Sequence, residues 1–299
     1  MIHLSNVKKR FKDIEAVEDV TLQVKKGSIY GLLGSNGAGK TTLLRMIAGI
    51  LKQDTGEISI NGNHVYENLE MKNRLFFIPD YPHFFSQYTI KQMAKFYQHT
   101  YENWNQERFT RLGDVFKIDV NKKIQSFSKG MQRQVAFWLA MSTMPDVLIL
   151  DEPIDGLDPV MRKIVKNLII QDVAEREMTV LISSHNLREI EDLCDHIGIL
   201  HRGSLLLEKE IDDLKSDHHK IQVSFRNELP SNWLDGLDVV YKEKRGSVFL
   251  FIIRGKEEAV SAHIKEFQPI IFDLLPLTLE EIFIYEMGGA GYDVNNILV

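Results

Sequence analysis

The fold of this chain is decided by the stretch Ile29-Tyr-Gly-Leu-Leu33 and the loop after it, Gly34-Ser-Asn-Gly-Ala-Gly39-Lys40-Thr41. The loop matches the pattern G-x-x-x-x-G-K-[ST] at every fixed position. The apolar run before it predicts a short strand, and a helical pattern begins at Lys40. A strand, a glycine loop and a helix in this order are typical of a nucleotide-binding βα unit.

The chemistry of phosphate binding explains this spacing. Glycines let consecutive backbone N–H groups curve around phosphate oxygens, and the helix start adds the positive end of its dipole. We expect Lys40 to reach the β- and γ-phosphates and the Thr41 hydroxyl to bind Mg²⁺. The expected nucleotide-binding residues of this loop are Gly34, Ser35, Asn36, Gly37, Ala38, Gly39, Lys40, Thr41 and Thr42. A glycine-rich turn without a ligand is the alternative, and the strand-loop-helix context argues against it.

A second apolar run, Val147 to Leu150, ends in the carboxylates of Asp151 and Glu152. We expect this strand to lie beside the strand that feeds the glycine loop. Asp151 would then hold Mg²⁺, usually through water, and Glu152 would act on the attacking water as general base or positioning group. The alternative is that the two acids simply end a strand in solvent and have no catalytic role. The presence of the glycine loop in the same chain argues against it.

The pattern between and after these motifs predicts further elements. A helical pattern runs from about Thr89 to Leu112, and another helix follows Ser128. The composition changes near residue 212, where Asp212 to His219 is a polar candidate linker that includes His218 and His219. These two histidines could bind a metal ion, but no further ligands stand nearby, so we expect both to lie in a solvated linker. Strands at 221–225, 239–241 and 247–253 and helices at 257–267 and 277–287 predict a small α+β appendage beyond it.

Four motifs together resemble those of ATP-binding-cassette (ABC) ATPases. Phe127-Ser128-Lys129-Gly130-Met131-Gln132 is similar to the Leu-Ser-Gly-Gly-Gln signature of that family. It is followed, in the family's order, by Asp151-Glu152-Pro153, by Gly156-Leu157-Asp158-Pro159 and by Ser183-Ser184-His185. The resemblance covers about residues 1 to 210. The signature and the segment Leu279-Glu-Glu-Ile-Phe283 are similar to those of ATPase subunits of bacterial ABC-2-type exporters, which include antibiotic and peptide exporters.

The resemblance implies an α/β fold, a P-loop NTPase core of the ABC type with a mixed sheet. The ATP-binding domain would span residues 1–211, with a helical subdomain at about 89–142, and residues 212–299 would form a small C-terminal α+β accessory domain. It also implies the cofactors ATP and Mg²⁺, hydrolysis of ATP, and an integral-membrane permease as partner. The subunit would be a homodimer or a heterodimer with another ABC ATPase subunit, at the cytoplasmic face of the membrane.

The resemblance also assigns roles to single residues across a head-to-tail dimer with ATP at its interface. Ser128 and Gly130 would face the γ-phosphate bound by the opposite subunit, although Ser128 also suits a simple helix N-cap. His185 would contact the same phosphate and align the attacking water with Glu152. Asp158 would communicate across the dimer, or serve only as a turn residue before Pro159. Phe11 would stack on adenine, or pack as an ordinary aromatic residue.

Two departures from the family pattern stand out. The signature holds Lys129 and Met131 where the pattern has glycine and glutamine. The position of the Q-loop glutamine holds Asp80, which still offers an oxygen to Mg²⁺ but is charged and shorter. The aromatic and proline cluster from Tyr81 to Phe85 is a candidate for part of a permease groove, with core packing as the alternative.

Composition excludes several rival classes. The chain has 299 residues, 36 Lys+Arg against 42 Asp+Glu, and a formal net charge of −6, so the basic excess of a nucleic-acid-binding protein is absent. No window nears the ~20 apolar residues of a membrane-spanning helix, and the one cysteine, Cys194, forms no internal disulfide. A soluble ABC ATPase acting on ribosomes or DNA is the main alternative, although such families usually carry two cassettes or a coiled coil. A non-hydrolysing member of a mixed dimer is a second, against which Lys40, Asp151, Glu152 and His185 argue.

Overall fold

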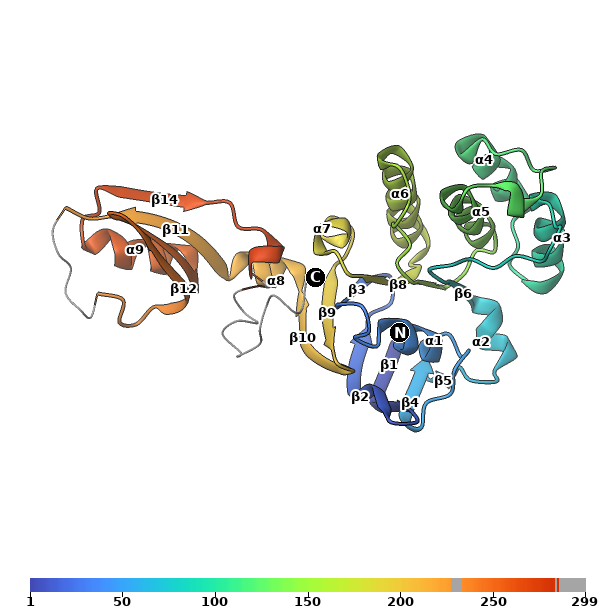
Figure 1. The fold of residues 1–299 in the computed structure, drawn as a ribbon, viewed down its shortest axis with the longest axis horizontal. Coiled ribbons are helices and arrows are strands. Elements are labelled where there is room, and N and C mark those ends of the chain that lie inside the picture. Colours follow the sequence, from blue (N-terminus) through green and yellow to red (C-terminus); the bar gives the residue numbers. More distant parts are fainter. Residues whose placement is uncertain (227–232, 283, 285–299) are drawn as a thin grey trace. The chain divides into compact units, whose positions relative to one another are not determined.

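The computed structural model describes residues 1–226, 233–282 and 284. The chain divides into two compact units, residues 1–208 and 209–299 (Figure 1). Among the described residues, no helix is both long and apolar enough to cross a membrane.

A six-stranded sheet forms the centre of the N-terminal unit, with strand order β10-β9-β3-β8-β7-β6. Its four inner pairings, from β9 through β3, β8 and β7 to β6, are parallel. Strands β3, β7 and β8 are buried along their whole length, as expected of parallel strands covered on both faces. The strands are β3 (Ile29–Leu33), β6 (Leu75–Ile78), β7 (Val147–Leu150), β8 (Thr179–Ser184), β9 (His196–His201) and β10 (Ser204–Glu210).

A second, antiparallel sheet has the order β2-β1-β4-β5. Its strands are β1 (Ile2–Phe11), β2 (Ile14–Val24), β4 (Thr55–Ile60) and β5 (Asn63–His64). Alternating residues of β1, such as Ile2 and Leu4, are buried. They share one apolar core with Leu43 and Leu44 of helix α1 (Lys40–Ile47) and with Leu32 of the central sheet. The helix that follows the glycine loop is therefore anchored to both sheets.

Three helices gather beyond the β6 edge of the central sheet (Figure 1). They are α3 (Ile90–Thr100), α4 (Gln106–Phe116) and α5 (Lys129–Ser142), with the 3₁₀ turn η1 (Ile124–Ser126) before α5. Trp138 of α5 is buried and stacks on Phe109 and Phe116 of α4. The other helices of this unit are α2 (Leu69–Arg74), α6 (Pro159–Arg176) and α7 (Leu187–Ile190).

The single helical pattern predicted from Thr89 to Leu112 is wrong in one respect, because the chain leaves the helix between α3 and α4. Thr89 opens α3 with a capping box, in which its side chain and that of Gln92 satisfy each other's backbone N–H groups. Asn105 opens α4, and its side chain accepts a hydrogen bond from the Arg108 N–H at 2.8 Å. This second N-cap restarts the helix within an apolar periodicity that continues across the break.

The C-terminal unit contains an antiparallel sheet of order β12-β13-β11-β14. If β11 to β14 are numbered 1 to 4 in chain order, the sheet read from β14 has the order 4-1-3-2, which is the strand order of the ferredoxin-like motif. Helix α9 contributes Val260 and Ile264 to one core with Trp233 and with Phe251 of β13. The elements are α8 (Ile211–Ser216), β11 (His218–Ser224), β12 (Asp238–Arg245), β13 (Val248–Arg254), α9 (Glu257–Glu266) and β14 (Ile271–Leu275).

The predicted linker from Asp212 to His219 is wrong, since these residues form α8 and the start of β11. Ile211 and Leu214 bury one side of the short helix, so its polar residues are its solvent face. His218 is only 6% exposed, and its Nδ1 lies 2.9 Å from the Leu214 carbonyl oxygen, which contradicts a solvated side chain. A further helix begins at Leu279, and its predicted extension to Met287 lies outside the described residues.

Candidate nucleotide-binding site

A cleft of about 500 Å³ lies against the glycine loop. Its lining combines residues 35–42 with Asp80 and Glu152, which follow β6 and β7. Arg202, which follows β9, lines it as well. Since parallel strands end at the same edge of a sheet, the topology alone brings these loops together.

The glycine loop has a shape that only glycine allows at Gly39. Its φ is +107°, and a Cβ atom there would lie 2.2 Å from the carbonyl oxygen of Ala16. Gly34 approaches the Leu200 carbonyl oxygen just as closely, with a Cβ distance of 2.3 Å. The loop therefore lies in close contact with β2 and β9, as only glycines at these positions permit.

Lys40 places a cation inside this loop. The side chain is 5% exposed, and Nζ donates hydrogen bonds to the carbonyl oxygens of Gly34 at 2.6 Å and Ser35 at 3.2 Å. The same ammonium group lies 3.1 Å from Oε1 of Glu152. The residues predicted to bind phosphate and to act on water are thus in direct contact.

The prediction that the strand before Asp151 and Glu152, β7, lies beside β3 is wrong. Strand β8 lies between β3 and β7. Ser183 of β8 donates from Oγ to Oδ1 of Asp151 at 2.7 Å, and its Oγ accepts from the Glu152 N–H at 3.0 Å. Because β8 is the neighbour of β7, Ser183 of β8 contacts both acids. His185, which follows β8, lies at the same edge of the sheet.

Asp151 is almost fully buried, at 1% exposure. Burial raises the pKa of this carboxyl above its ordinary value, and the nearby charges of Glu152 and Asp80 act in the same direction. Hydrogen bonds from the hydroxyls of Ser183 and Thr41 oppose that rise in pKa. Thr41 and Asp151 are therefore adjacent, and they offer the hydroxyl and carboxylate oxygens that Mg²⁺ prefers.

Glu152 is held from two sides. Its Oε2 lies 2.9 Å from Nδ1 of His185 and also accepts the His185 backbone N–H at 3.3 Å, while its Oε1 faces Lys40. Glu152 has a φ of +48°, an uncommon conformation for a residue with a side chain. A carboxylate oxygen of Asp155 lies within 4.8 Å of a carboxylate oxygen of Glu152 and a ring nitrogen of His185, so these three side chains bring together atoms that can bind a metal ion. The fold thus fixes one carboxylate between a cation and an imidazole beside the loop.

The other predicted residues lie apart from the cleft of their own chain. Ser128 caps α5, accepting the Met131 N–H at 3.3 Å, and Asp158 caps α6, accepting the N–H groups of Val160 and Met161, each at 3.0 Å. The side chains of Ser128 and Asp158 are exposed. Ser128 is thus the helix N-cap that was considered for it, and Asp158, considered as a turn residue before Pro159, caps a helix as well. Both side chains keep an outward face.

The β1–β2 hairpin contributes to the lining of the cleft, but not through Phe11. Of the residues described in this hairpin, Ile14, Glu15 and Ala16 line the cleft and Phe11 does not. Phe11 pairs with Ile14 across the hairpin, is 44% exposed and lies under Lys9, whose Nζ is 5.5 Å from the ring centroid. Ile14 was not predicted from the sequence as a lining residue; its only signal was its place two residues after Lys12 in the turn.

Comparison with known proteins assigns the family. Residues 17–155 match the family described as ABC transporter. The ABC transporter ATP-binding protein YtrB of Bacillus subtilis (strain 168) is 32% identical over 97% of this chain and 99% of its own length. The bacitracin transport ATP-binding protein BcrA of Bacillus licheniformis is 36% identical over 97% of this chain and 98% of its own.

Solved structures give the same answer for the fold. An ATP-binding subunit of an ABC transporter has a TM-score of 0.67 at 27% identity, over 72% of this chain and 92% of that chain. The post-hydrolysis dimer of the ATP-binding cassette MJ0796 bound to ADP and Pi has a TM-score of 0.64 at 21% identity, over 71% and 99% of the two chains. The predicted fold class is confirmed. Because two ATP-binding proteins match over nearly their whole length, the chain belongs to the ABC transporter ATP-binding protein family and is an ABC-type ATPase.

Proposed function

We propose that this chain is the ATPase subunit of an exporter and drives a separate integral-membrane permease. The full-length similarity to a bacitracin transport protein supports export of an antibiotic-like or peptide cargo. The Lys40–Glu152–His185 arrangement is the observation that carries the ATPase chemistry. Nothing in the composition or the comparisons favours a ribosomal or DNA-bound role.

In this proposal the chain's own residues divide the work of hydrolysis. The loop N–H groups and Lys40 bind the phosphates and hold the γ-phosphate in place. Glu152 accepts a proton from the attacking water or orients it, and His185 fixes the carboxylate of Glu152 through Nδ1. Catalysis then comes from positioning and from the electrostatics of a partly buried site.

The residues that would hold Mg²⁺ are Thr41 and Asp151. Their adjacent hydroxyl and carboxylate oxygens fit a hard cation. When bound with ATP, such an ion neutralises charge on the phosphate oxygens. Asp80 lines the same cleft.

We place the interface of an ATP-bound dimer on the exposed ends of α5 and α6. Ser128 and Asp158 are exposed there. A Cβ atom at Gly130 would lie 2.8 Å from the Gly156 carbonyl oxygen, so the start of α5 lies against the loop that precedes α6. A second cassette, identical or different, would present its bound γ-phosphate to Ser128 and to the N–H groups at this helix start.

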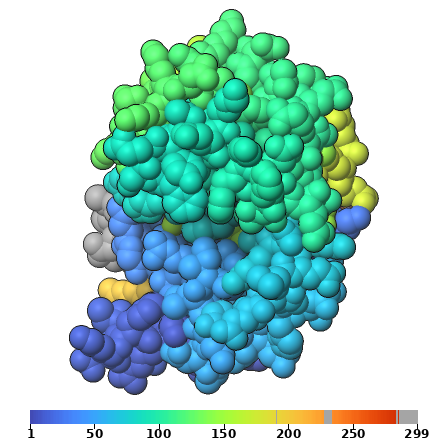
Figure 2. All heavy atoms as spheres, turned by 90° about the vertical axis from the view of Figure 1, so that its right-hand side faces the viewer, coloured from blue at the N-terminus to red at the C-terminus, as the bar shows by residue number. Residues whose placement is uncertain are grey.

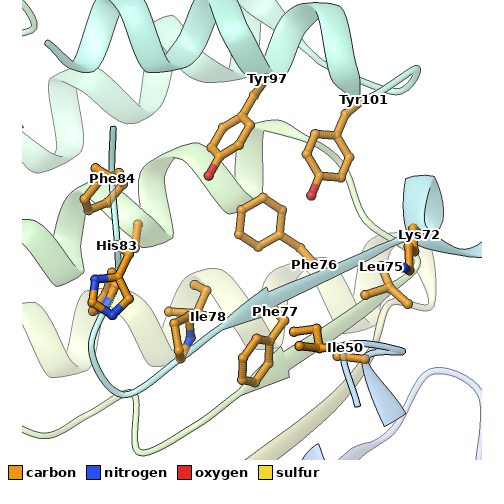
Figure 3. A pocket seen from close by; sticks show the side chains of 14 residues that line it. Ile50, Lys72, Leu75, Phe76, Phe77, Ile78, His83, Phe84, Tyr97 and Tyr101 are labelled. Atoms are coloured by element: carbon orange, nitrogen blue, oxygen red, sulfur yellow. The ribbon is translucent and has the colours of Figure 1, made fainter. Parts of the chain in front are cut away.

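We propose that the permease docks in an apolar groove of about 370 Å³ beside β6. Figure 2 shows this side of the molecule, with residues of the α3 to α5 region above those of about 45–80. In Figure 3 Tyr97 and Tyr101 point from α3 and its C-cap toward Phe76 of β6, while His83 and Lys72 lie at opposite ends of the groove. Burial raises the pKa of Tyr101 to about 12, so this hydroxyl stays neutral. We therefore expect the permease to insert an amphipathic segment, with its apolar face on the aromatic lining and an acidic residue near Lys72 or His83.

The test is a pull-down of the tagged chain from its own detergent-solubilised membranes, read by mass spectrometry. Ile50 lines the groove and is 58% exposed, whereas Leu69 is 78% exposed and lies outside it. We expect an integral-membrane protein in near-stoichiometric amount with the wild type and with Leu69→Asp, and its loss with Ile50→Asp. A second cassette in the eluate would show a mixed dimer. Ribosomal or other soluble partners in place of a membrane protein would contradict the exporter proposal.

A further inference from the structure

A buried arginine connects the cleft to the signature helix α5. Arg133 is 8% exposed, and its Nη2 donates to Oδ1 of Asp80 at 2.8 Å and to the carbonyl oxygen of Asp80. Its Nη1 donates to the carbonyl oxygen of Asp155. One guanidinium group therefore holds two loops together. The first follows β6 and contains Asp80, which stands where the family pattern has the Q-loop glutamine; the second follows Glu152.

The same face of α5 makes a second contact with the loop after β6. Lys129 precedes Arg133 by one helical turn, and residues four apart lie on one face of a helix. Its Nζ lies 5.3 Å from the ring centroid of Tyr81, the residue after Asp80. Lys129 of the signature and Asp80 at the Q-loop position both depart from the family pattern, and they are parts of one contact region.

Electrostatics explains what Arg133 does there. Asp80 lines the cleft and is close enough to Asp151 to interact with its charge. With Glu152, three carboxylates lie near the proposed Thr41–Asp151 metal site, and a neutral glutamine in place of Asp80 would leave two. The guanidinium cation of Arg133, 2.8 Å from Oδ1 of Asp80, offsets the additional negative charge.

We propose that Arg133 is a positioning residue for hydrolysis. It keeps Asp80 beside the metal position as one half of a neutral ion pair, so Asp80 is not itself a Mg²⁺ ligand. The inference rests on the proposed Thr41–Asp151 metal site and names a residue that the ABC motifs do not mark in this chain. It replaces the expectation that Asp80 gives an oxygen to the metal.

The test compares Arg133→Gln, Asp80→Asn and the double variant. The first readout is binding of Mn²⁺ to the full chain with ADP, followed by electron paramagnetic resonance, which needs no turnover. Arg133→Gln leaves Asp80 unpaired and is expected to tighten Mn²⁺ binding, whereas Asp80→Asn leaves Arg133 unpaired and is expected to weaken it. Each shift is expected to be roughly three- to tenfold for one unpaired charge in a partly exposed site. The double variant restores neutrality and is expected within about twofold of wild type.

The second readout is the Mg²⁺ dependence and kcat of ATP hydrolysis, with thermal unfolding measured for each variant. Arg133→Lys keeps the charge but loses the fork that reaches Asp155, so we expect normal Mn²⁺ binding with lower kcat. Lys95→Gln removes an exposed cation on α3 outside the cleft and is expected to leave both readouts unchanged.

Two outcomes would overturn the inference. A double variant that binds Mn²⁺ as weakly as Asp80→Asn would make Asp80 a direct ligand. Single variants that lower the unfolding temperature but do not shift Mn²⁺ binding in opposite directions would reduce Arg133 to a structural residue. If wild-type protein itself bound no Mn²⁺ with nucleotide, the proposed metal site would fail and not this inference alone.

Discussion

Nζ of Lys40 lies 3.1 Å from Oε1 of Glu152, although the two residues follow strands that are separated by β8. The second oxygen of the same carboxylate faces His185 at 2.9 Å. One carboxylate thus joins the glycine loop to the end of β8. A phosphate that binds the Lys40 ammonium group competes with the Glu152 carboxylate for that cation. Nucleotide binding is therefore expected to weaken the ion pair that holds Glu152, the residue proposed to act on water.

The first prediction concerns this cation. Lys40→Met keeps the length of the side chain and removes its charge. A hydrogen bond to a charged group contributes about 1.5–3 kcal/mol, so ATP affinity is expected to fall roughly 10- to 100-fold. Titration with a fluorescent ATP analogue measures the change, with Lys26→Met as an exposed lysine control. Unchanged affinity in Lys40→Met would rule out the phosphate role of Lys40.

The second prediction concerns the shape of the loop. A Cβ atom at Gly39 would collide with the Ala16 carbonyl oxygen, so Gly39→Ala must move the loop away from β2. Gly62 has a similar positive φ of +78° but no atom within 4 Å of its Cβ position, so Gly62→Ala controls for backbone strain alone. We expect nucleotide binding to be lost in Gly39→Ala and kept in Gly62→Ala. Equal effects of the two substitutions on binding would show that strain, not loop geometry, is responsible.

The third prediction concerns the buried acid. Because burial raises the pKa of Asp151 in the folded protein, its ionised form costs stability. That cost is absent below the ordinary pKa of about 3.8, grows as the pH rises, and is complete above the raised pKa. Asp151→Asn is therefore expected to be more stable than wild type at pH 7, with the difference vanishing toward pH 4.

Urea denaturation at several pH values measures this difference in the free energy of unfolding. Asp13→Asn, an exposed carboxylate in the β1–β2 turn, is expected to show no such pH-dependent gain. Adding ATP and Mg²⁺ is expected to stabilise wild type more than Asp151→Asn, because only the carboxylate supports the metal site. A variant that is less stable than wild type at pH 7 without ligand would contradict the account of Asp151.

The local parts of this site were predictable from sequence. The glycine loop, the acidic strand end and the position of His185 each depend on a short stretch whose backbone form follows from its own residues. Their meeting could also be expected, because parallel strands end at one edge of a sheet. The order of the strands could not, since nothing near Val147 to Leu150 shows that β8 lies between it and β3.

Long-range pairs were beyond sequence reasoning for a physical reason. Asp80 and Arg133 each belong to an ordinary local pattern, and only the packing of α5 beside the loop after β6 brings their charges together. The polar run from Asp212 to His219 misled for the opposite reason. Its buried side consists of Ile211 and Leu214 alone, too few apolar residues to show a helical period.

The most direct test of the account measures ATP turnover and retention in Glu152→Gln. Glutamine preserves the size of the side chain but cannot accept the proton of the attacking water. We expect kcat to fall roughly 10²- to 10⁴-fold, with ATP affinity kept and an ATP-bound dimer detectable by light scattering. Turnover at the wild-type rate in this variant would contradict the central claim that Glu152 acts on the attacking water.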